Sequence, residues 1–169
     1  MLSALTSPRQ RLLWLPIVFL AGCAVNPVTG KNELMLLDET QEINMGATQY
    51  EPSQQSQGGR YMSDPDLTLY VSEIGQRLAR VADRSLPYEF VIIDDSTPNA
   101  WALPGGKIAV NRGLLTKLNS EAELAAVLSH EIVHAAARHS AKSIERGMLL
   151  SGVIGVASSA IDQNAGNYG

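Results

Sequence analysis

The stretch from Glu121 to Arg146 constrains the fold most, because it contains neither glycine nor proline that would interrupt a helix. Ser120 precedes it and Glu123 follows three residues later, which is the capping-box pattern. We therefore expect one long helix, running to about Ser140 or beyond. Inside it lies the sequence His130-Glu131-Ile132-Val133-His134. The fold has to accommodate a long helix that carries this motif.

The spacing of this motif favours a metal site. On a helix, His130 and His134 lie on one face, one turn apart, where two imidazoles can bind one zinc ion. Glu131 lies beside that face and can act as a general base toward water at the metal without being a ligand. We therefore predict one Zn²⁺ per chain, bound by His130 and His134, with Glu131 as the catalytic base of a peptide hydrolase.

A simpler alternative is two solvated histidines beside a surface glutamate. The surroundings argue against it, because they predict a mostly buried helix in which unpaired imidazoles would be costly. The apolar residues around the motif are Leu124, Ala125, Ala126, Val127, Leu128, Ile132, Val133 and Ala135 to Ala137.

A third metal ligand is harder to find. His139 is the only other histidine, and on a continuous helix it faces away from His134, so we expect it at the helix end or on the surface. The only acids after the motif are Glu145 and Asp162. Glu145 follows on what is expected to be the same helix, and Asp162 lies in a turn-like segment. Neither is expected to complete the site.

The N-terminus, residues 1–22, predicts a secretory signal peptide. Arg9 and Arg11 precede the apolar run Leu12–Ala21, which is shorter than the roughly 20 residues of a comfortable membrane span. The run ends in Leu20-Ala21-Gly22-Cys23, which resembles a bacterial lipobox.

A lipobox predicts that Cys23 is lipidated and becomes the mature N-terminus. Ala24, rather than Asp, then favours the periplasmic face of the outer membrane. The alternative is a buried cysteine at the end of one anchoring helix, which Pro16 disfavours. A single cysteine excludes an intramolecular disulfide framework, and a net charge of −4 gives no global attraction for nucleic acid.

The remaining patterns predict a helix-dominated α+β fold with a small sheet before the long helix. The length of 169 residues favours one modest domain. Strands are expected at Tyr88–Ile93, Asn99–Leu103 and Lys107–Val110. Helices are expected from Asp38, from Asp64-Pro65 with a core-facing stripe of Leu67, Tyr70, Val71, Ile74, Leu78 and Val81, and at Leu114–Leu118.

Three segments outside these elements have their own expectations. Asn26–Gly30 is a turn-rich tether, and Glu51–Gly59 is a loop. Gly147–Ile161 is apolar and rich in small residues, which favours a packed helix or hairpin leg over a membrane-dipping segment.

At two places the sequence resembles a known family beyond the motif itself. Asn99 to Gly106 reads Asn-Ala-Trp-Ala-Leu-Pro-Gly-Gly, and Glu121 to His134 fits the pattern E-x-E-L-A-x-V-L-x-H-E-x-x-H. Both are similar to the HExxH zinc metalloendopeptidases that include HtpX, the CaaX prenyl-protein endopeptidase and the periplasmic β-barrel assembly-enhancing protease. The resemblance covers about residues 26–155, and the lipobox points to the small periplasmic lipoprotein branch.

This resemblance implies a zincin-like (gluzincin) domain whose third zinc ligand is a glutamate on a later helix. The chain has no such motif after His134, so we expect a fragment or truncated product with impaired zinc binding. The domain division expected is a signal peptide at 1–22, a lipid-anchored tether and helix at 23–60, and a catalytic domain at 61–169 that is incomplete at its C-terminus.

The resemblance also implies substrates and partners. Asn99 and Ala100 would lie on an edge strand that receives the substrate by β-addition, although Asn99 could equally be a turn residue and Trp101 a core aromatic. Substrates would be unfolded or misassembled envelope proteins, and an outer-membrane assembly machine is a possible partner. The alternative function is a non-catalytic, chaperone-like periplasmic binding lipoprotein, and a weaker one is a misfolded remnant.

Overall fold

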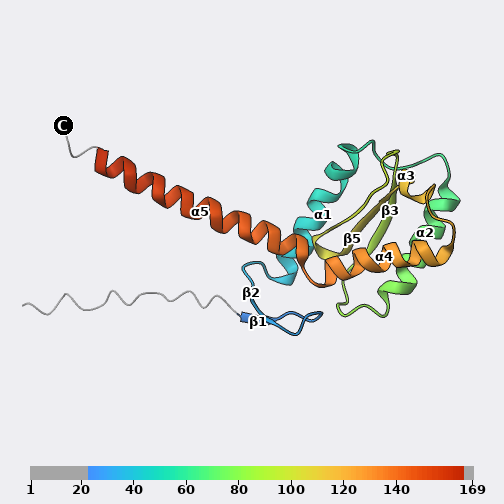
Figure 1. Cartoon of the computed structure of the whole chain (residues 1–169), viewed down its shortest axis with the longest axis horizontal. Coiled ribbons are helices and arrows are strands. Elements are labelled where there is room, and N and C mark those ends of the chain that lie inside the picture. The colour runs from blue at the N-terminus through green and yellow to red at the C-terminus, as the bar shows by residue number, and fades with distance from the viewer. Residues whose placement is uncertain (1–22, 166–169) are drawn as a thin grey trace, which may run out of the picture.

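The computed structural model describes the backbone of residues 23–165 and the side chains of residues 25–152. In Figure 1 a small sheet is surrounded by helices, and together they form the body of the molecule, from which a long C-terminal helix extends. The expected signal peptide and the side chain of Cys23 lie outside the described part of the chain. Among the described helices, none is long and apolar enough to cross a membrane.

The central sheet has three strands in the order β3-β5-β4. β3 (Glu89–Ile93) runs parallel to β5 (Lys107–Asn111), and β4 (Ala100–Leu103) runs antiparallel to β5. A short 3-10 turn, η1 (Pro104–Gly106), joins β4 to β5. All three strands lie where the sequence predicts them, and the α+β class is confirmed. α3 (Arg112–Leu115) begins earlier than expected.

Two helices begin at the predicted caps. The side chain of Asp38 caps α1 (Glu39–Gln55) by accepting from the backbone N–H of Gln41, and the Gln41 side chain accepts from the Asp38 N–H, which completes a capping box. The side chain of Asp64 accepts a backbone N–H of α2 (Pro65–Ala79) in the same way. Satisfying these free N–H groups locally fixes where each helix starts.

Two details of the helix predictions are wrong. The expected loop over Glu51–Gly59 starts late, because α1 continues through Pro52 to Gln55. A proline in the last turns removes only one backbone donor, so the helix tolerates it. In the stripe expected to face the core, Tyr70 is 41% exposed and Val81 is 84% exposed. Val81 lies beyond the last residue of α2, where helical periodicity no longer applies.

The sheet is covered on both faces. Its side chains alternate, so that one face packs against α2 and α4 (Glu121–Ala136) and the other against α1. The first face contributes Phe90, Ile92, Ile108 and Val110, and the second contributes Val91, Ile93 and Ala109 with Tyr50 of α1. α4 therefore lies directly on the core, with its position fixed by the sheet.

The single long helix expected from residue 120 is interrupted once. α4 ends at Ala136, the chain turns at Arg138, and α5 (His139–Ala165) begins in a new direction. Arg138 has a φ of 62°, in the left-handed region that side chains other than glycine rarely adopt. Such a conformation persists only where surrounding contacts stabilise it.

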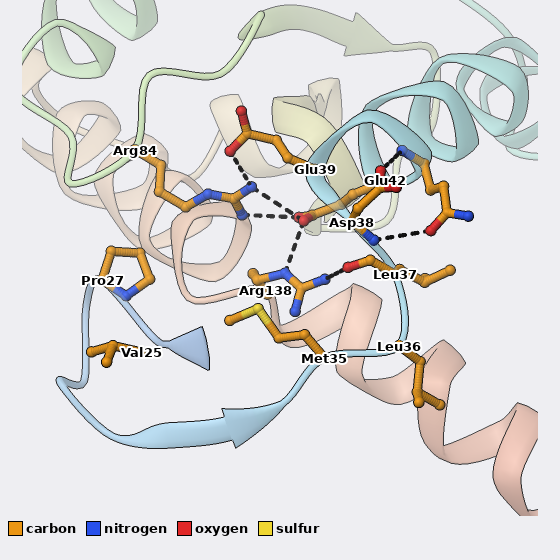
Figure 2. Close-up of a pocket in the computed structure, with 11 residues that line it drawn as sticks. Val25, Pro27, Met35, Leu36, Leu37, Asp38, Glu39, Glu42, Arg84 and Arg138 are labelled. Carbon is orange, nitrogen blue, oxygen red and sulfur yellow. Dashed lines mark hydrogen bonds and ion pairs between the residues drawn. The ribbon is translucent and has the colours of Figure 1, made fainter. Parts of the chain in front are cut away.

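Those contacts come from the N-terminal part of the chain, as Figure 2 shows. The Arg138 guanidinium donates from Nε to Glu42 at 2.9 Å and from Nη2 to the carbonyl of Leu37 at 2.7 Å. Arg84 donates to both oxygens of the same Glu42 carboxylate, at 3.0 and 3.2 Å. The carboxylate is fully buried, and the network lines a cavity of about 570 Å³.

The N-terminal hairpin also holds this turn. β1 (Cys23–Val25) pairs with β2 (Asn32–Leu34), and Asn26 lies between them, fully buried. Its Oδ1 accepts two backbone N–H groups of the following turn, and its Nδ2 donates to the carbonyl of Ala137 at 3.0 Å. The predicted turn is confirmed, and it is docked on the body of the protein rather than being a loose tether.

α5 extends away from this body (Figure 1). The predicted helix over Gly147–Ile161 is confirmed. The expectation that this helix packs against the rest of the protein is wrong for its first residues. Met148, Leu149 and Leu150 are 47%, 48% and 65% exposed. The backbone of Asp162 belongs to this helix rather than to a turn, and its side chain lies outside the described residues.

Candidate metal centre

The HExxH motif lies in the second half of α4. The side chain of Ser120 accepts from the Glu123 N–H at 3.2 Å, which caps the helix as predicted. The other half of the predicted capping box differs, because the Glu123 carboxylate accepts from the backbone N–H of Asn119 at 2.6 Å rather than from that of Ser120. Leu124, Leu128 and Ile132 anchor its inner face in the core. With the helix fixed in this way, its outer face presents His130 and His134 side by side.

The two imidazoles converge. Nε2 of His130 lies 2.9 Å from Nε2 of His134. Two nitrogen ligands of one tetrahedral zinc, each about 2.05 Å from the ion, lie roughly 3.3 Å apart. A small rotation of either ring therefore brings both nitrogens to the positions that one ion requires. The residues present fit a metal as two of its ligands.

The exposure of the motif differs from the sequence prediction. His130 is exposed and His134 is half-buried, and Val133 between them is 44% exposed. The helix is buried on one face only, because α2 and the sheet cover just that side. The predicted cost of burying unpaired imidazoles therefore does not apply to His130. The convergence of the two imidazoles is what disfavours two separately solvated histidines.

Glu131 is the buried member of the motif, with 9% of its surface exposed. Burial raises the pKa of its carboxyl, and the neighbouring His134 and His130 partly oppose this rise. A carboxylate that holds its proton more tightly is a stronger proton acceptor, which suits a general base.

His139 lies next to His134, contrary to the sequence prediction. Its Nδ1 is 2.7 Å from Nδ1 of His134, and the two rings meet edge to face with centroids 4.7 Å apart. The prediction failed because it assumed a continuous helix, whereas the turn at Arg138 brings His139 back. Burial lowers the pKa of His139, and the neighbouring His134 and Lys142 lower it further.

Glu145 is not available to a metal at this centre. Its carboxylate is buried, accepts from the backbone N–H groups of Leu36 and Leu37 at 3.1 and 3.0 Å, and pairs with Arg138 at 3.3 Å. The sequence also disfavoured Glu145, but for a wrong reason, since it lies on a separate helix from the motif. Within residues 25–152, no three side chains of His, Cys, Asp or Glu form a group that could hold a metal ion.

The edge strand β4 lies beside α4. The carbonyl of Asn99 accepts from the N–H of Asn111 at 2.9 Å, so its main chain points into the sheet. Main-chain groups alternate along a strand, which turns those of Ala100 and Ala102 toward the free edge. Ser140 already donates to the Ala102 carbonyl at 2.8 Å. Ala100 is therefore the better placed of the two predicted residues for pairing with an added strand.

Trp101 packs on the opposite face of the sheet from α4. Its ring meets Tyr50 edge to face, with centroids 6.1 Å apart, and its Nε1 donates to Gln57 at 3.1 Å. Trp101 is therefore a packed aromatic of the core, which was the alternative that the sequence offered for it.

Sequence reasoning missed the importance of Arg138, Glu42 and Asn26. Neither Arg138 nor Glu42 carries a local signal, because each acts through a partner that is distant in the sequence. Asn26 does carry one, since an Asn before Pro-Val-Thr-Gly is a frequent turn former. That signal predicts the turn but not its contact with Ala137.

A helix that carries HExxH beside a small mixed sheet is the arrangement expected of the HExxH metallopeptidases. The model of peptidase family M48 matches residues 65–168 of the sequence. The chain belongs to this family, which confirms the family predicted from its motifs.

Curated relatives agree with this assignment. The chain is 34% identical over 167 residues to the mitochondrial metalloendopeptidase OMA1 of Schizosaccharomyces pombe, an alignment that covers 92% of the chain and 50% of that protein. It is 32% identical over 120 residues to the β-barrel assembly-enhancing protease of Escherichia coli, covering 70% of the chain and 24% of that protein. A putative β-barrel assembly-enhancing protease of Vibrio cholerae is 42% identical over 85 residues, covering 50% and 18%. The chain thus spans half or less of these relatives.

Proposed function

We propose that the chain carries the catalytic helix of a zinc-dependent endopeptidase. The observation that carries this proposal is the convergence of Nε2 of His130 and Nε2 of His134 at 2.9 Å, beside the buried carboxyl of Glu131. In this proposal the two histidines are ligands of one Zn²⁺ per chain, and Glu131 is the catalytic base. Membership of a peptidase family whose relatives are named metalloendopeptidases supports it.

The proposed reaction is hydrolysis of a peptide bond. Zinc bound at this centre supplies a Lewis acid that polarises the peptide carbonyl and makes water more acidic. Glu131 takes a proton from the attacking water as the new C–O bond forms. It gives that proton to the amine nitrogen as the C–N bond breaks. The products are an amine and a carboxylic acid, which releases the second proton of the water to solvent and becomes a carboxylate, and Glu131 returns to its starting state.

Catalytic zinc sites usually have three protein ligands, and the described side chains supply two. We propose that a carboxylate from outside residues 25–152 completes the site. The resemblance of the motifs to the wider family supports a glutamate from a later helix.

The proposed substrate is an extended polypeptide that adds to the edge of β4. Its main chain would pair with Ala100, next to Asn99, and bring a peptide bond toward α4. The free edge of β4 beside α4, and the inward-facing main chain of Asn99, support this assignment. Recognition through main-chain groups would accept many sequences, as suits a protease of unfolded proteins.

The proposed setting is the bacterial cell envelope, with Cys23 lipidated and the domain anchored on the periplasmic face of the outer membrane. The lipobox-like end of the apolar run supports this proposal, as do the two bacterial relatives that are named β-barrel assembly-enhancing proteases. Unfolded or misassembled envelope proteins would then be the substrates in protein quality control, and an outer-membrane assembly machine would be a partner.

Zinc content and cleavage of an unfolded protein such as casein test the proposal together. The wild-type chain should bind about one zinc ion, more weakly than a site with three described protein ligands would, and His134→Ala should lose it. Glu131→Gln should retain the metal and lose cleavage, whereas Glu121→Gln, an exposed glutamate at the start of the same helix, should change neither. Absence of zinc from the wild-type chain would reject the proposed centre. Equal binding of casein by wild type and Glu131→Gln, without cleavage by either, would instead favour the binding lipoprotein.

A further inference from the structure

The contact between His134 and His139 indicates which ring nitrogen of His134 carries the proton. Two ring nitrogens 2.7 Å apart form a hydrogen bond only if one of them carries a hydrogen and the other does not. The opposite nitrogen of His134, Nε2, points toward Nε2 of His130, where the proposed zinc binds. A nitrogen that binds a metal carries no proton, so the single proton of a neutral His134 belongs on Nδ1.

The geometry points to His139 as a positioning residue for the metal centre, accepting a hydrogen bond from Nδ1–H of His134. This inference rests on the proposed zinc function and extends it. The bond fixes His134 in the tautomer whose Nε2 is free to bind metal, and it also fixes the orientation of the ring. Partners of this kind raise the basicity of a ligand and are typically worth 10–100-fold in metal affinity.

His139 is not itself a ligand of the same ion. It contacts the Nδ1 side of His134, whereas the proposed ion lies on the Nε2 side. The Nδ1 and Nε2 atoms of His134 point in different directions and cannot both face one metal ion. The His139 ring, which contacts Nδ1 of His134, is therefore directed away from the ion on the Nε2 side. His139 therefore acts through His134.

The position of His139 is set by the body of the protein. The turn before it is held at the Ala137 carbonyl by Asn26 and at the Arg138 guanidinium by Glu42 and Leu37. These partners come from the N-terminal part of the chain and are buried or nearly so. Directly after the turn, Ser140 is bonded to β4. The residues on both sides of His139, Arg138 and Ser140, are thus held by hydrogen bonds, and these bonds place His139 next to His134.

Two measurements on the full chain test this inference. The first is the tautomer of His134 in the metal-free protein, read from two-bond ¹H–¹⁵N correlation spectra at mildly alkaline pH. Wild type should show the proton on Nδ1, and His139→Ala should shift His134 toward the Nε2–H tautomer. The second is zinc affinity, measured by competition with a chelator, which should fall by about 10–100-fold in His139→Ala.

Two further variants separate positioning from general damage. His139→Asn places an amide oxygen where Nδ1 stood, so it should recover most of the affinity and the Nδ1–H tautomer. Ser143→Ala, an exposed residue of the same helix, should match wild type in both measurements. Since His139 is exposed, its variants should fold normally.

The outcomes separate this inference from the proposed function. A wild-type chain with the Nε2–H tautomer at His134, or equal zinc affinity in wild type and His139→Ala, would overturn the positioning role while leaving the zinc centre standing. A wild-type chain that binds no zinc would reject the proposed function. In that case the metal-free spectra still decide whether His134 donates to His139.

Discussion

Arg138 and Glu42 are joined by a hydrogen bond of 2.9 Å across 96 positions of the sequence. The Arg138 side chain is 4% exposed and the Glu42 side chain is fully buried. The same carboxylate also pairs with Arg84. This one carboxylate of α1 therefore links the segment after α2, through Arg84, to the turn that follows the HExxH helix, through Arg138.

Replacing Glu42 by Gln should therefore destabilise the protein strongly. Two largely buried guanidiniums would lose their shared counter-charge, and breaking a buried pair from one side typically costs about 3–5 kcal/mol. Urea unfolding measures the loss. Glu121→Gln is the matched control, because its pair with Arg77 is more than half exposed, and it should cost less than about 1 kcal/mol. Equal costs for the two variants would contradict a structural role for the buried network.

Two glycine substitutions should act in opposite directions. A Cβ at Gly46 would lie 1.8 Å from the carbonyl oxygen of Pro104, because α1 touches the η1 turn there. Gly46→Ala must push α1 off the turn, and we expect a loss of about 1–3 kcal/mol or more. Gly147 lies in α5 with open space around it, so Gly147→Ala should stabilise that helix by up to about 1 kcal/mol.

Thermal melts of both alanine variants, compared with wild type, measure these changes. A Gly46→Ala protein as stable as wild type would show that α1 does not touch η1 as closely as described. Circular dichroism of Gly147→Ala should show unchanged or slightly increased helix content.

Tyr50 should stabilise the fold through its hydroxyl. That group donates to the carbonyl of Ile108 at 2.6 Å, and burial raises its pKa. Tyr50→Phe leaves a buried carbonyl without this donor, which should cost about 1–2 kcal/mol. Tyr70→Phe is the control, because its hydroxyl donates to Glu121 on the surface, and it should change stability by less than about 0.5 kcal/mol. Denaturant unfolding distinguishes the two, and a larger effect at Tyr70 would contradict the assignment.

The parts of this fold that the sequence predicts are those determined by local physics. Asp38, Asp64 and Ser120 each satisfy backbone N–H groups within three residues of themselves, so their helix starts can be recognised without any tertiary information. The strands follow in the same way from short apolar and β-branched runs. His130 and His134 lie on one turn of helix, so their convergence also follows from spacing alone.

The turn at Arg138 could not be predicted in this way. The stretch around it contains no glycine or proline, and Ala135 to Arg138 are strong helix formers, so its local preference is to continue the helix. The left-handed conformation of Arg138 is stabilised by Glu42 and Leu37, which are distant in the sequence. The wrong placement of His139 follows from this one missed turn, because a continuous helix directs it away from His134.

The docking of the N-terminal hairpin should weaken in acid. Glu33 accepts hydrogen bonds from Lys142 of α5 at 2.6 Å and from Asn26 at 2.9 Å, and these bonds hold the pKa of Glu33 below its usual range. A carboxyl whose pKa is lower in the folded state stabilises the protein above its unfolded pKa of about 4.3. That contribution disappears as the pH falls through the lower, folded value.

Glu33→Gln removes the charge at every pH and so provides the comparison. Wild type should be more stable than Glu33→Gln near pH 7, and the difference should shrink as the pH falls below about 4.3 and vanish once it has passed the lower, folded pKa of Glu33. Chemical unfolding of both proteins across this range measures it. The protection factors of the Asn26 to Gly30 amides, corrected for the intrinsic exchange rate at each pH, should fall over the same range in wild type only. A difference in stability that stays constant with pH would show that the Glu33 carboxylate does not hold the hairpin to α5.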